Sequence, residues 1–155
     1  MDAKSNPAMP PERPSRKTSL SGEDDANTRP EVLVVEDQAA IGIMLELALR
    51  QFGFTVHLAG GGREALEAFS RHSDSIDVVL LDVQMPDLDG PETLAALRRI
   101  KLSVPVVFMS GHTGRHSPED LLALGATHLL HKPFNLDELS QLLWQLAGGP
   151  SRPPP

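Results

Sequence analysis

Residues 76–82 read IDVVLLD, and this stretch decides the fold class. Its four large apolar residues, at positions 78–81, follow one another without the alternation of a strand that has one solvated face. Consecutive apolar residues indicate a strand buried on both faces, as in a parallel sheet with helices on its two sides. Asp82 ends the run, so a carboxylate stands at the tip of a buried strand. It carries a desolvation cost there unless a cation or hydrogen bonds hold it.

Four further segments have the length and composition of strands. Residues 31–36 and 104–109 are also apolar on consecutive positions, which predicts central strands. Residues 54–58 alternate between apolar and polar side chains, and residues 127–130 form a short segment, which predicts two edge strands. Longer helical patterns separate these segments. Five β-α pairs with short connections predict right-handed crossovers and an α/β fold, a doubly wound five-stranded parallel sheet with five helices.

The expected helices have recognisable boundaries. The first stops at Gly53, and its apolar residues recur at three- and four-residue spacing: Ile41, Met44, Leu45, Ala48, Leu49 and Phe52. The second and third are expected over residues 63–72 and 91–100. Ser117 and Asn135 occupy N-cap positions of the fourth and fifth, and the fourth ends before Gly125.

The two ends of the chain differ from its body. Residues 1–30 contain five of the fourteen Pro residues and one large aliphatic residue, Leu20, and the last residues are again rich in Pro. Such segments cannot bury enough apolar surface to offset their ordering entropy. We therefore expect disordered tails at residues 1–30 and 148–155 around a single domain at residues 31–147, as the length of 155 residues also predicts.

Charge and composition exclude several classes of function. The formal net charge is −7, and residues 31–149 hold sixteen acidic and eight basic residues. Nucleic-acid binders need clustered Lys or Arg, so we expect no nucleic-acid partner, and a basic partner or a metal ion instead. The absence of Cys excludes disulfides, thiolate zinc sites and Cys nucleophiles. No signal peptide and no run of about 18 apolar residues is present, so we expect a soluble cytoplasmic protein without membrane contact.

Polar residues follow four of the five expected strands: Glu36 and Asp37 after the first, Asp82 after the third, Ser110 after the fourth and Lys132 after the fifth. Ligands bind at the carboxyl ends of the strands in such sheets, so we expect these side chains to converge. Each also has a simpler interpretation. The acidic pair resembles helix-start acids, the serine a turn hydroxyl, and the lysine a surface ammonium.

Taken together, these residue types predict phosphoryl chemistry. Three converging carboxylates repel one another and should hold a hard cation, and a site of carboxylates, backbone oxygen and water suits Mg²⁺. A carboxylate near the ion can attack phosphorus as a nucleophile. A lysine and a hydroxyl can bind the remaining oxygens of the transferred group.

With these motifs in view, residues 31–147 resemble the receiver domain of bacterial two-component response regulators, of the chemotaxis-type, stand-alone kind. The matching pieces are VLVVED, LLDVQMPDLDG, VPVVFMSGH and GATHLLHKPF, in the order and spacing of that family. The resemblance implies a flavodoxin-like fold with strand order 2-1-3-4-5.

The resemblance also implies a phosphoacceptor and its metal ligands. Asp82 would accept the phosphoryl group, and Mg²⁺ would be held by Asp37, by Glu36 through water, by Asp82, and by the backbone carbonyl of Gln84. Gln84 and His112, two residues after the phosphoacceptor and the switch hydroxyl, occupy positions that tune access of the hydrolytic water in the family. We expect the lifetime of the phosphorylated form to be sensitive to both.

The resemblance assigns Ser110 as the switch hydroxyl and Lys132 as the phosphate-binding cation, with a cis bond to Pro133. Gly90 matches the glycine that closes the loop after the phosphoacceptor. Leu129 is a departure, because many receivers have Tyr or Phe three residues before the lysine. The mechanical readout of phosphorylation is therefore expected to be altered, whereas phosphorylation itself is expected to persist.

The resemblance implies a signalling module in a two-component phosphorelay rather than an enzyme. A sensor histidine kinase or histidine phosphotransfer protein would phosphorylate Asp82, and a separate, unidentified protein target would receive the signal. The only reactions expected of the chain itself are Mg²⁺-dependent self-phosphorylation from a donor and slow autodephosphorylation. Nothing after residue 147 is long enough for an output domain, so we expect output through protein contact.

Three alternatives remain open. An aspartyl-phosphate phosphatase on a related fold usually has a second acid two residues after its nucleophile, where this chain has Gln84. A nucleotide- or flavin-binding module needs a glycine-rich turn after the first strand, whereas the glycines at 60–62 follow the second. A receiver that signals without phosphate would not need the complete set of acids, hydroxyl and lysine.

Overall fold

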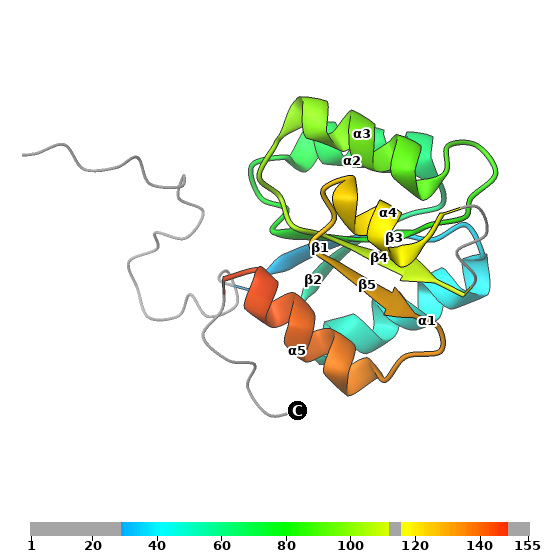
Figure 1. Cartoon of the computed structure of the whole chain (residues 1–155). Helices are drawn as coiled ribbons and strands as arrows, with labels where there is room; N and C mark the ends of the chain where they lie inside the picture. The colour runs from blue at the N-terminus through cyan, green and yellow to red at the C-terminus, as the bar shows by residue number, and fades with distance from the viewer. Residues whose placement is uncertain (1–28, 112–115, 149–155) are drawn as a thin grey trace, which may run out of the picture.

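Five short strands form one parallel sheet in the order β2-β1-β3-β4-β5 (Figure 1). The structure is a computed structural model, and it describes residues 29–111 and 116–148. The strands are β1 (Glu31–Val35), β2 (Thr55–Ala59), β3 (Val78–Asp82), β4 (Val106–Ser110) and β5 (His128–His131). The helices are α1 (Ala39–Gln51), α2 (Gly62–His72), α3 (Gly90–Ile100), α4 (Pro118–Ala123) and α5 (Leu136–Leu146). The predicted fold class, strand order and number of elements are therefore confirmed.

Two hydrophobic clusters, one on each face of the sheet, explain the consecutive apolar residues of the central strands. Leu33 and Val35 of β1 face the cluster that includes residues of α2, α3 and α4. Val32 and Val34 face the cluster that includes residues of α1 and α5. Figure 1 shows the corresponding layers, with α2 and α3 on one side of the sheet and α1 and α5 on the other. Each central strand is thus buried on both faces, as its sequence predicts.

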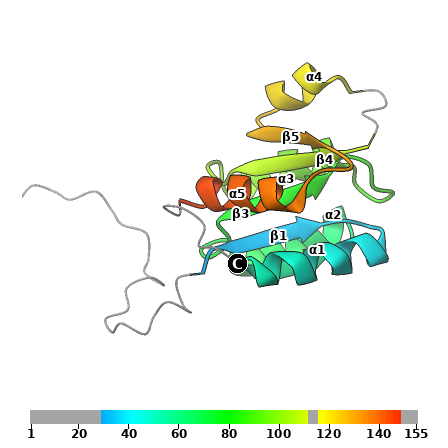
Figure 2. The ribbon, with the colours of Figure 1, turned by 90° about the horizontal axis from the view of Figure 1, so that it is seen from below.

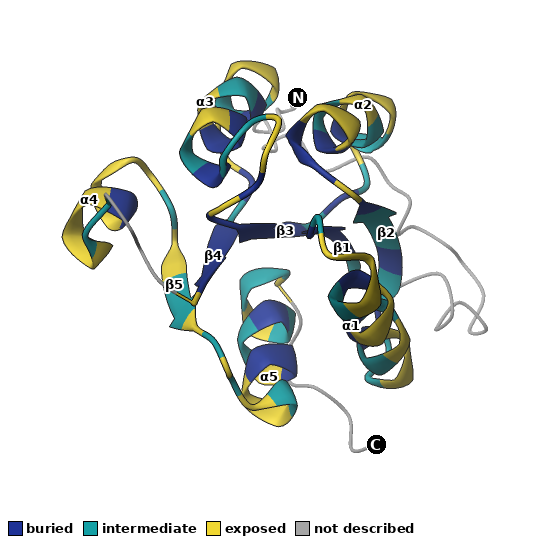
Figure 3. Cartoon of the chain, turned by 90° about the vertical axis from the view of Figure 1, so that its right-hand side faces the viewer, coloured by how far each residue is buried: buried dark blue, intermediate teal, exposed yellow. Residues whose placement is uncertain are grey.

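The edge of the sheet at β5 is thinly covered. All five residues of β3 and of β4 are buried, whereas β5 has two exposed and two half-buried residues. In Figure 3 the central strands are dark blue and β5 is mostly yellow and teal. The neighbouring helix α4 buries a single residue, Leu121, and lies apart from the other helices in Figure 2. The weakest part of the packing is therefore the α4–β5 corner.

The helices end for the expected local reasons. Gly53 follows α1 with a φ of 97°, a left-handed conformation that favours glycine. The side chains of Ser117 and Asn135 accept the amide hydrogens of Asp120 and Glu138 at the starts of α4 and α5, as predicted. Asp89 forms a reciprocal capping box with Glu92 at the start of α3.

Some sequence predictions are wrong in detail. Every predicted strand differs from the observed one by one or two residues at one or both ends. Apolar flanking residues such as Ile76 and Val104 continue the pattern beyond the assigned strand, whereas the polar strand-end residue Ser110 belongs to its strand without an apolar signal. Met44 was expected on the buried face of α1, but 47% of its surface is exposed. Met44 follows Ile41 by three residues and lies outside the contact between α1 and the sheet. Leu45, four residues after Ile41, is buried in that contact instead.

The predicted tails fall largely outside the described residues, and so do His112 and the rest of residues 112–115. Within the part of the chain that the structure describes, no helix combines the length and apolar character needed to cross a bilayer.

Candidate active site at the carboxyl ends of the strands

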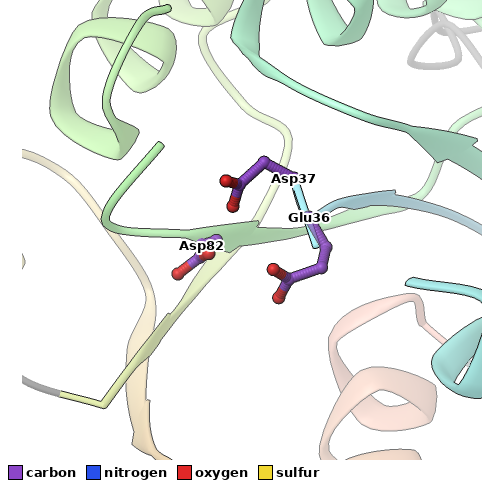
Figure 4. Close-up of side chains that lie close together, drawn as sticks. All are labelled: Glu36, Asp37 and Asp82. Atoms are coloured by element: carbon purple, nitrogen blue, oxygen red, sulfur yellow. The ribbon is translucent and has the colours of Figure 1, made fainter. Parts of the chain in front are cut away.

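The predicted site residues meet at one edge of the sheet. Val35 pairs with Leu81, so the residues that follow them, Glu36 and Asp82, lie side by side at the carboxyl ends of β1 and β3. Carboxylate oxygens of Glu36, Asp37 and Asp82 all lie within 4.8 Å of one another. Figure 4 shows these three side chains close together at the ends of the two strands. Among the described residues, this is the one such cluster of possible metal ligands.

Glu36 is the most deeply buried acid of the three, with 1% of its surface exposed. Its carboxylate accepts hydrogen bonds from Lys132 Nζ at 3.2 Å and from the backbone N–H of Gln38 at 3.1 Å. Gln38 is the N-cap residue of α1, and its side chain makes no capping hydrogen bond. Glu36 accepts a backbone N–H at the start of α1, but it also binds Lys132 and clusters with the other two carboxylates, so its role is not limited to the helix start. The surface interpretation of Lys132 is wrong because its ammonium turns into the acidic cluster.

Opposing effects act on the pKa of the Asp82 carboxyl. Burial and the neighbouring charge of Glu36 raise the pKa of its carboxyl from 3.8 to about 6. The ammonium of Lys132, 3.6 Å from Asp82 Oδ1, and the backbone N–H of Gln84 lower that pKa. The net rise means that burial, together with the charge of Glu36, outweighs the stabilisation of the Asp82 carboxylate by Lys132 and the Gln84 amide. A bound cation would favour the charged form of this carboxyl.

Ser110 ends β4 next to the cluster. Its hydroxyl is buried and has no hydrogen-bond partner among the described residues. A cavity of about 360 Å³ is lined by Asp82, Gln84, Ser110 and Lys132 together with their neighbours. A buried hydroxyl without a partner beside such a cavity can donate to an oxygen of a bound group.

Two positions beside the site, Pro133 and Gly90, have special backbone geometry or close backbone contacts. The bond between Lys132 and Pro133 is cis, as predicted. A side chain at Gly90 would come within 2.7 Å of the carbonyl oxygen of Asp82, so this position requires glycine. Leu129, which occupies the usual aromatic position, is half-buried and packs against the core on the α3 and α4 side of the sheet.

Sequence reasoning missed one acidic residue near the site. Asp87 follows Asp82 by five residues, and its carboxylate accepts the backbone N–H groups of Gly62 and Arg63 at 3.2 and 3.1 Å. These contacts join residues more than twenty positions apart, so local sequence patterns carry no signal for them. The glycines at 60–62 are the one visible clue, because they follow a strand without any motif to explain them.

The parallel sheet in this order and the acid, hydroxyl and lysine at its carboxyl ends define a receiver-type α/β domain. The model of the response regulator receiver domain family matches residues 32–143. The chain belongs to this family, and it is a receiver domain of two-component systems.

Known proteins agree with this assignment. The sensor kinase CckA of Brucella abortus is 38% identical over 109 residues, which are 70% of this chain and 12% of that protein. Among solved structures, Vibrio cholerae chemotaxis protein CheY4 has a TM-score of 0.70 and 31% identity, over 77% of this chain and 99% of CheY4. The receiver domain of the Pseudomonas aeruginosa sensor kinase PA1611, solved with magnesium in its active-site cleft, has a TM-score of 0.70 and 28% identity, over 79% of this chain and all of that domain.

The chain spans less than half the length of the curated relatives it matches, with shares from 12% to 46%. The similarity therefore concerns the receiver domain and not the other parts of those proteins.

Proposed function

We propose that this receiver accepts a phosphoryl group on Asp82 from a phosphohistidine of a sensor histidine kinase or a histidine phosphotransfer protein. The receiver unit of this proposal comprises residues 31–147, and it acts in the cytoplasm. The observation that carries the proposal is the convergence of three carboxylates and a lysine beside a cavity that Asp82, Lys132 and the unpartnered hydroxyl of Ser110 line. These groups combine a nucleophile with side chains that can bind phosphoryl oxygens.

Mg²⁺ fits this site because oxygens of three carboxylates converge within 4.8 Å of one another, and because burial and the charge of Glu36 raise the pKa of Asp82. Asp37, Asp82 and the backbone carbonyl of Gln84 would hold the ion, with Glu36 acting through water. When bound, the ion would neutralise charge on the carboxylates and on the phosphoryl oxygens. Lys132 already contacts both Glu36 and Asp82 and is positioned to bind a phosphoryl oxygen from the side of β5.

The reaction that follows is a simple transfer. A carboxylate oxygen of Asp82 attacks phosphorus, the phosphorus–nitrogen bond of the donor breaks, and the imidazole leaves with its electron pair and takes up a proton. The hydroxyl of Ser110 then gains the partner that it lacks, by donating to a phosphoryl oxygen. The environment of the β4 end thus differs between the two forms, which gives a protein target a difference to recognise.

The chain itself would catalyse only its own phosphorylation from a donor and a slow loss of the group. The lifetime of the phosphorylated form is expected to depend on Gln84, which is exposed beside the site, and on His112. An aspartyl-phosphate phosphatase would need an acid near position 84 to protonate its leaving group. That need is not met by Gln84.

The test is the intact mass after incubation with acetyl phosphate or phosphoramidate and Mg²⁺. The wild-type chain should gain one phosphoryl group that hydroxylamine removes, and Asp82→Asn should gain none. Glu46→Gln, a half-buried position of α1 whose carboxylate pairs with Arg50, is a matched control that removes a carboxylate outside the acidic cluster and should be phosphorylated normally. Absence of a gain in the wild type at any Mg²⁺ concentration would favour a receiver that signals without phosphate.

A further inference from the structure

The glycine-rich turn between β2 and α2 packs directly against the loop that follows Asp82. A Cβ atom placed on Gly62 would lie 2.6 Å from Leu88 Cβ and closer still to Thr93 Oγ1. Real Cβ atoms do not approach other atoms so closely, so the contact requires glycine for space. The start of α2 and the β3–α3 loop, residues 83–89, are therefore interlocked.

Asp87, in the β3–α3 loop, strengthens the contact between that loop and the start of α2. Gly61, the N-cap residue of α2, offers no side chain, and the carboxylate of Asp87 accepts the first free amide hydrogens of the helix instead, at Gly62 and Arg63. These backbone N–H groups hold the pKa of the Asp87 carboxyl below its ordinary value. Asp87 thus caps a helix that lies more than twenty residues earlier in the chain.

Both ends of the β3–α3 loop are also tied to the sheet or to α3. The backbone N–H of Val83 donates to Met109 at 3.0 Å, and that of Gly90 donates to the carbonyl of Val83 at 2.8 Å. Asp89 begins α3 with its capping box. Gln84 lies between these ties and lines the cavity, and its backbone N–H lowers the pKa of Asp82.

We propose that Asp87 and Gly62 are positioning residues for the metal and phosphoryl site. They fix how the β3–α3 loop lies on α2, and so they fix the backbone of Gln84 beside Asp82. This inference rests on the proposed function, because it assigns the two residues a role toward the Mg²⁺ that the site is proposed to bind. Neither residue touches the reacting atoms.

The test compares Mg²⁺ affinity of full-length variants by isothermal titration calorimetry, with Mg²⁺ alone as the ligand. Asp87→Ala and Gly62→Ala should weaken Mg²⁺ binding roughly 10-fold, the size of effect that residues supporting metal ligands commonly have. Asp87→Asn keeps a side-chain oxygen that can accept an amide hydrogen, so it should recover part of the affinity.

Two controls separate this role from helix capping and from any change of side chain. Asp77→Ala removes a carboxylate that accepts the backbone N–H of Glu31 at 2.9 Å, but at the amino ends of the strands. Gly60→Ala places a Cβ near only the mobile end of Glu64. Both should bind Mg²⁺ like the wild type.

Hydrogen exchange of the Gln84 amide in Mg²⁺-free protein gives a second readout. It should quicken in Asp87→Ala and Gly62→Ala relative to the Val79 amide, which lies in the middle of β3 and serves as a stability reference. Should Gly62→Ala fail to fold, Asp87→Ala and its Asn rescue decide alone.

The outcomes separate the two proposals. Equal Mg²⁺ affinity and equal Gln84 exchange in Asp87→Ala and the wild type would overturn the positioning role while leaving the proposed function intact. Failure of the wild type to bind Mg²⁺ would instead contradict the proposed function, and the positioning role with it.

Discussion

The two sides of the candidate site differ in how closely their described residues are packed. The β3–α3 loop is tied to β4, α2 and α3 through hydrogen bonds and close glycine contacts. On the other flank, Ser110 has a buried hydroxyl without a partner, and the next described helix, α4, buries one residue. The comparison teaches that the two walls of the site differ in packing. The wall formed by the β3–α3 loop is rigid because many contacts hold it, and the wall next to the β5 edge has little packing to hold one arrangement.

The largest expected effects test this difference in packing. Leu97 on α3 and Leu121 on α4 are both fully buried. Leu97→Ala should lower the free energy of unfolding by about 2–5 kcal/mol, the usual cost of such a cavity. Leu121→Ala should cost less, because α4 has no second buried residue and can detach locally instead of weakening the whole domain. Urea denaturation measures both, and equal losses would show that α4 belongs to the same cooperative core as α3.

A smaller effect concerns the charge on the rigid wall. The pKa of Asp82 is raised in the folded protein to about 6, so its contribution to stability is complete below pH 4 and is lost as the pH rises through 6. Above that pH the folded protein holds an unfavourable charge. Asp82→Asn should therefore raise the free energy of unfolding by about 1–3 kcal/mol at pH 8 without Mg²⁺, and the gain should vanish near pH 4.

Asp87, on the same loop, should give the opposite dependence of stability on pH. Backbone N–H groups lower the pKa of its carboxyl, so its contribution to stability is present at neutral pH and is lost as the pH falls through the folded-state pKa. Asp87→Asn should therefore reduce stability at pH 7, and the deficit should shrink in acid. Because the Asp87 contribution is lost only below its ordinary pKa of 3.8, chemical denaturation of both variants from about pH 2 to pH 8 gives the comparison, and parallel pH profiles would contradict it.

The smallest effect concerns the two buried serines. Ser140 on α5 donates to the carbonyl of Asp137 at 3.0 Å, whereas Ser110 lacks a hydrogen-bond partner. Ser140→Ala should cost about 0.5–1.5 kcal/mol for the lost hydrogen bond. Ser110→Ala should leave the free energy of unfolding within about 0.5 kcal/mol of the wild type or raise it, because no hydrogen bond is lost. A loss at Ser110 as large as that at Ser140 would mean that its hydroxyl is already paired in the unphosphorylated protein.

The sequence predicts much of the site because the relevant signals are local. Consecutive apolar residues 78–81 require burial on both faces, and a parallel sheet brings the residues after its strands to one edge. Asp82, Ser110 and Lys132 could therefore be placed together before their contacts were known. Met44 was misplaced because helical spacing alone does not say how wide the contact with the sheet is.

The sequence by itself determined the succession of strands and helices along the chain and the residues that stand at the strand ends. Both follow from the period of the apolar pattern and from chain connectivity. Only the tertiary structure decided that Lys132 turns toward Glu36, that burial beside Glu36 raises the pKa of Asp82, and that Asp87 caps α2. These properties depend on distances between residues far apart in the chain. Charge interactions and hydrogen bonds act through space, and the folded packing sets those distances.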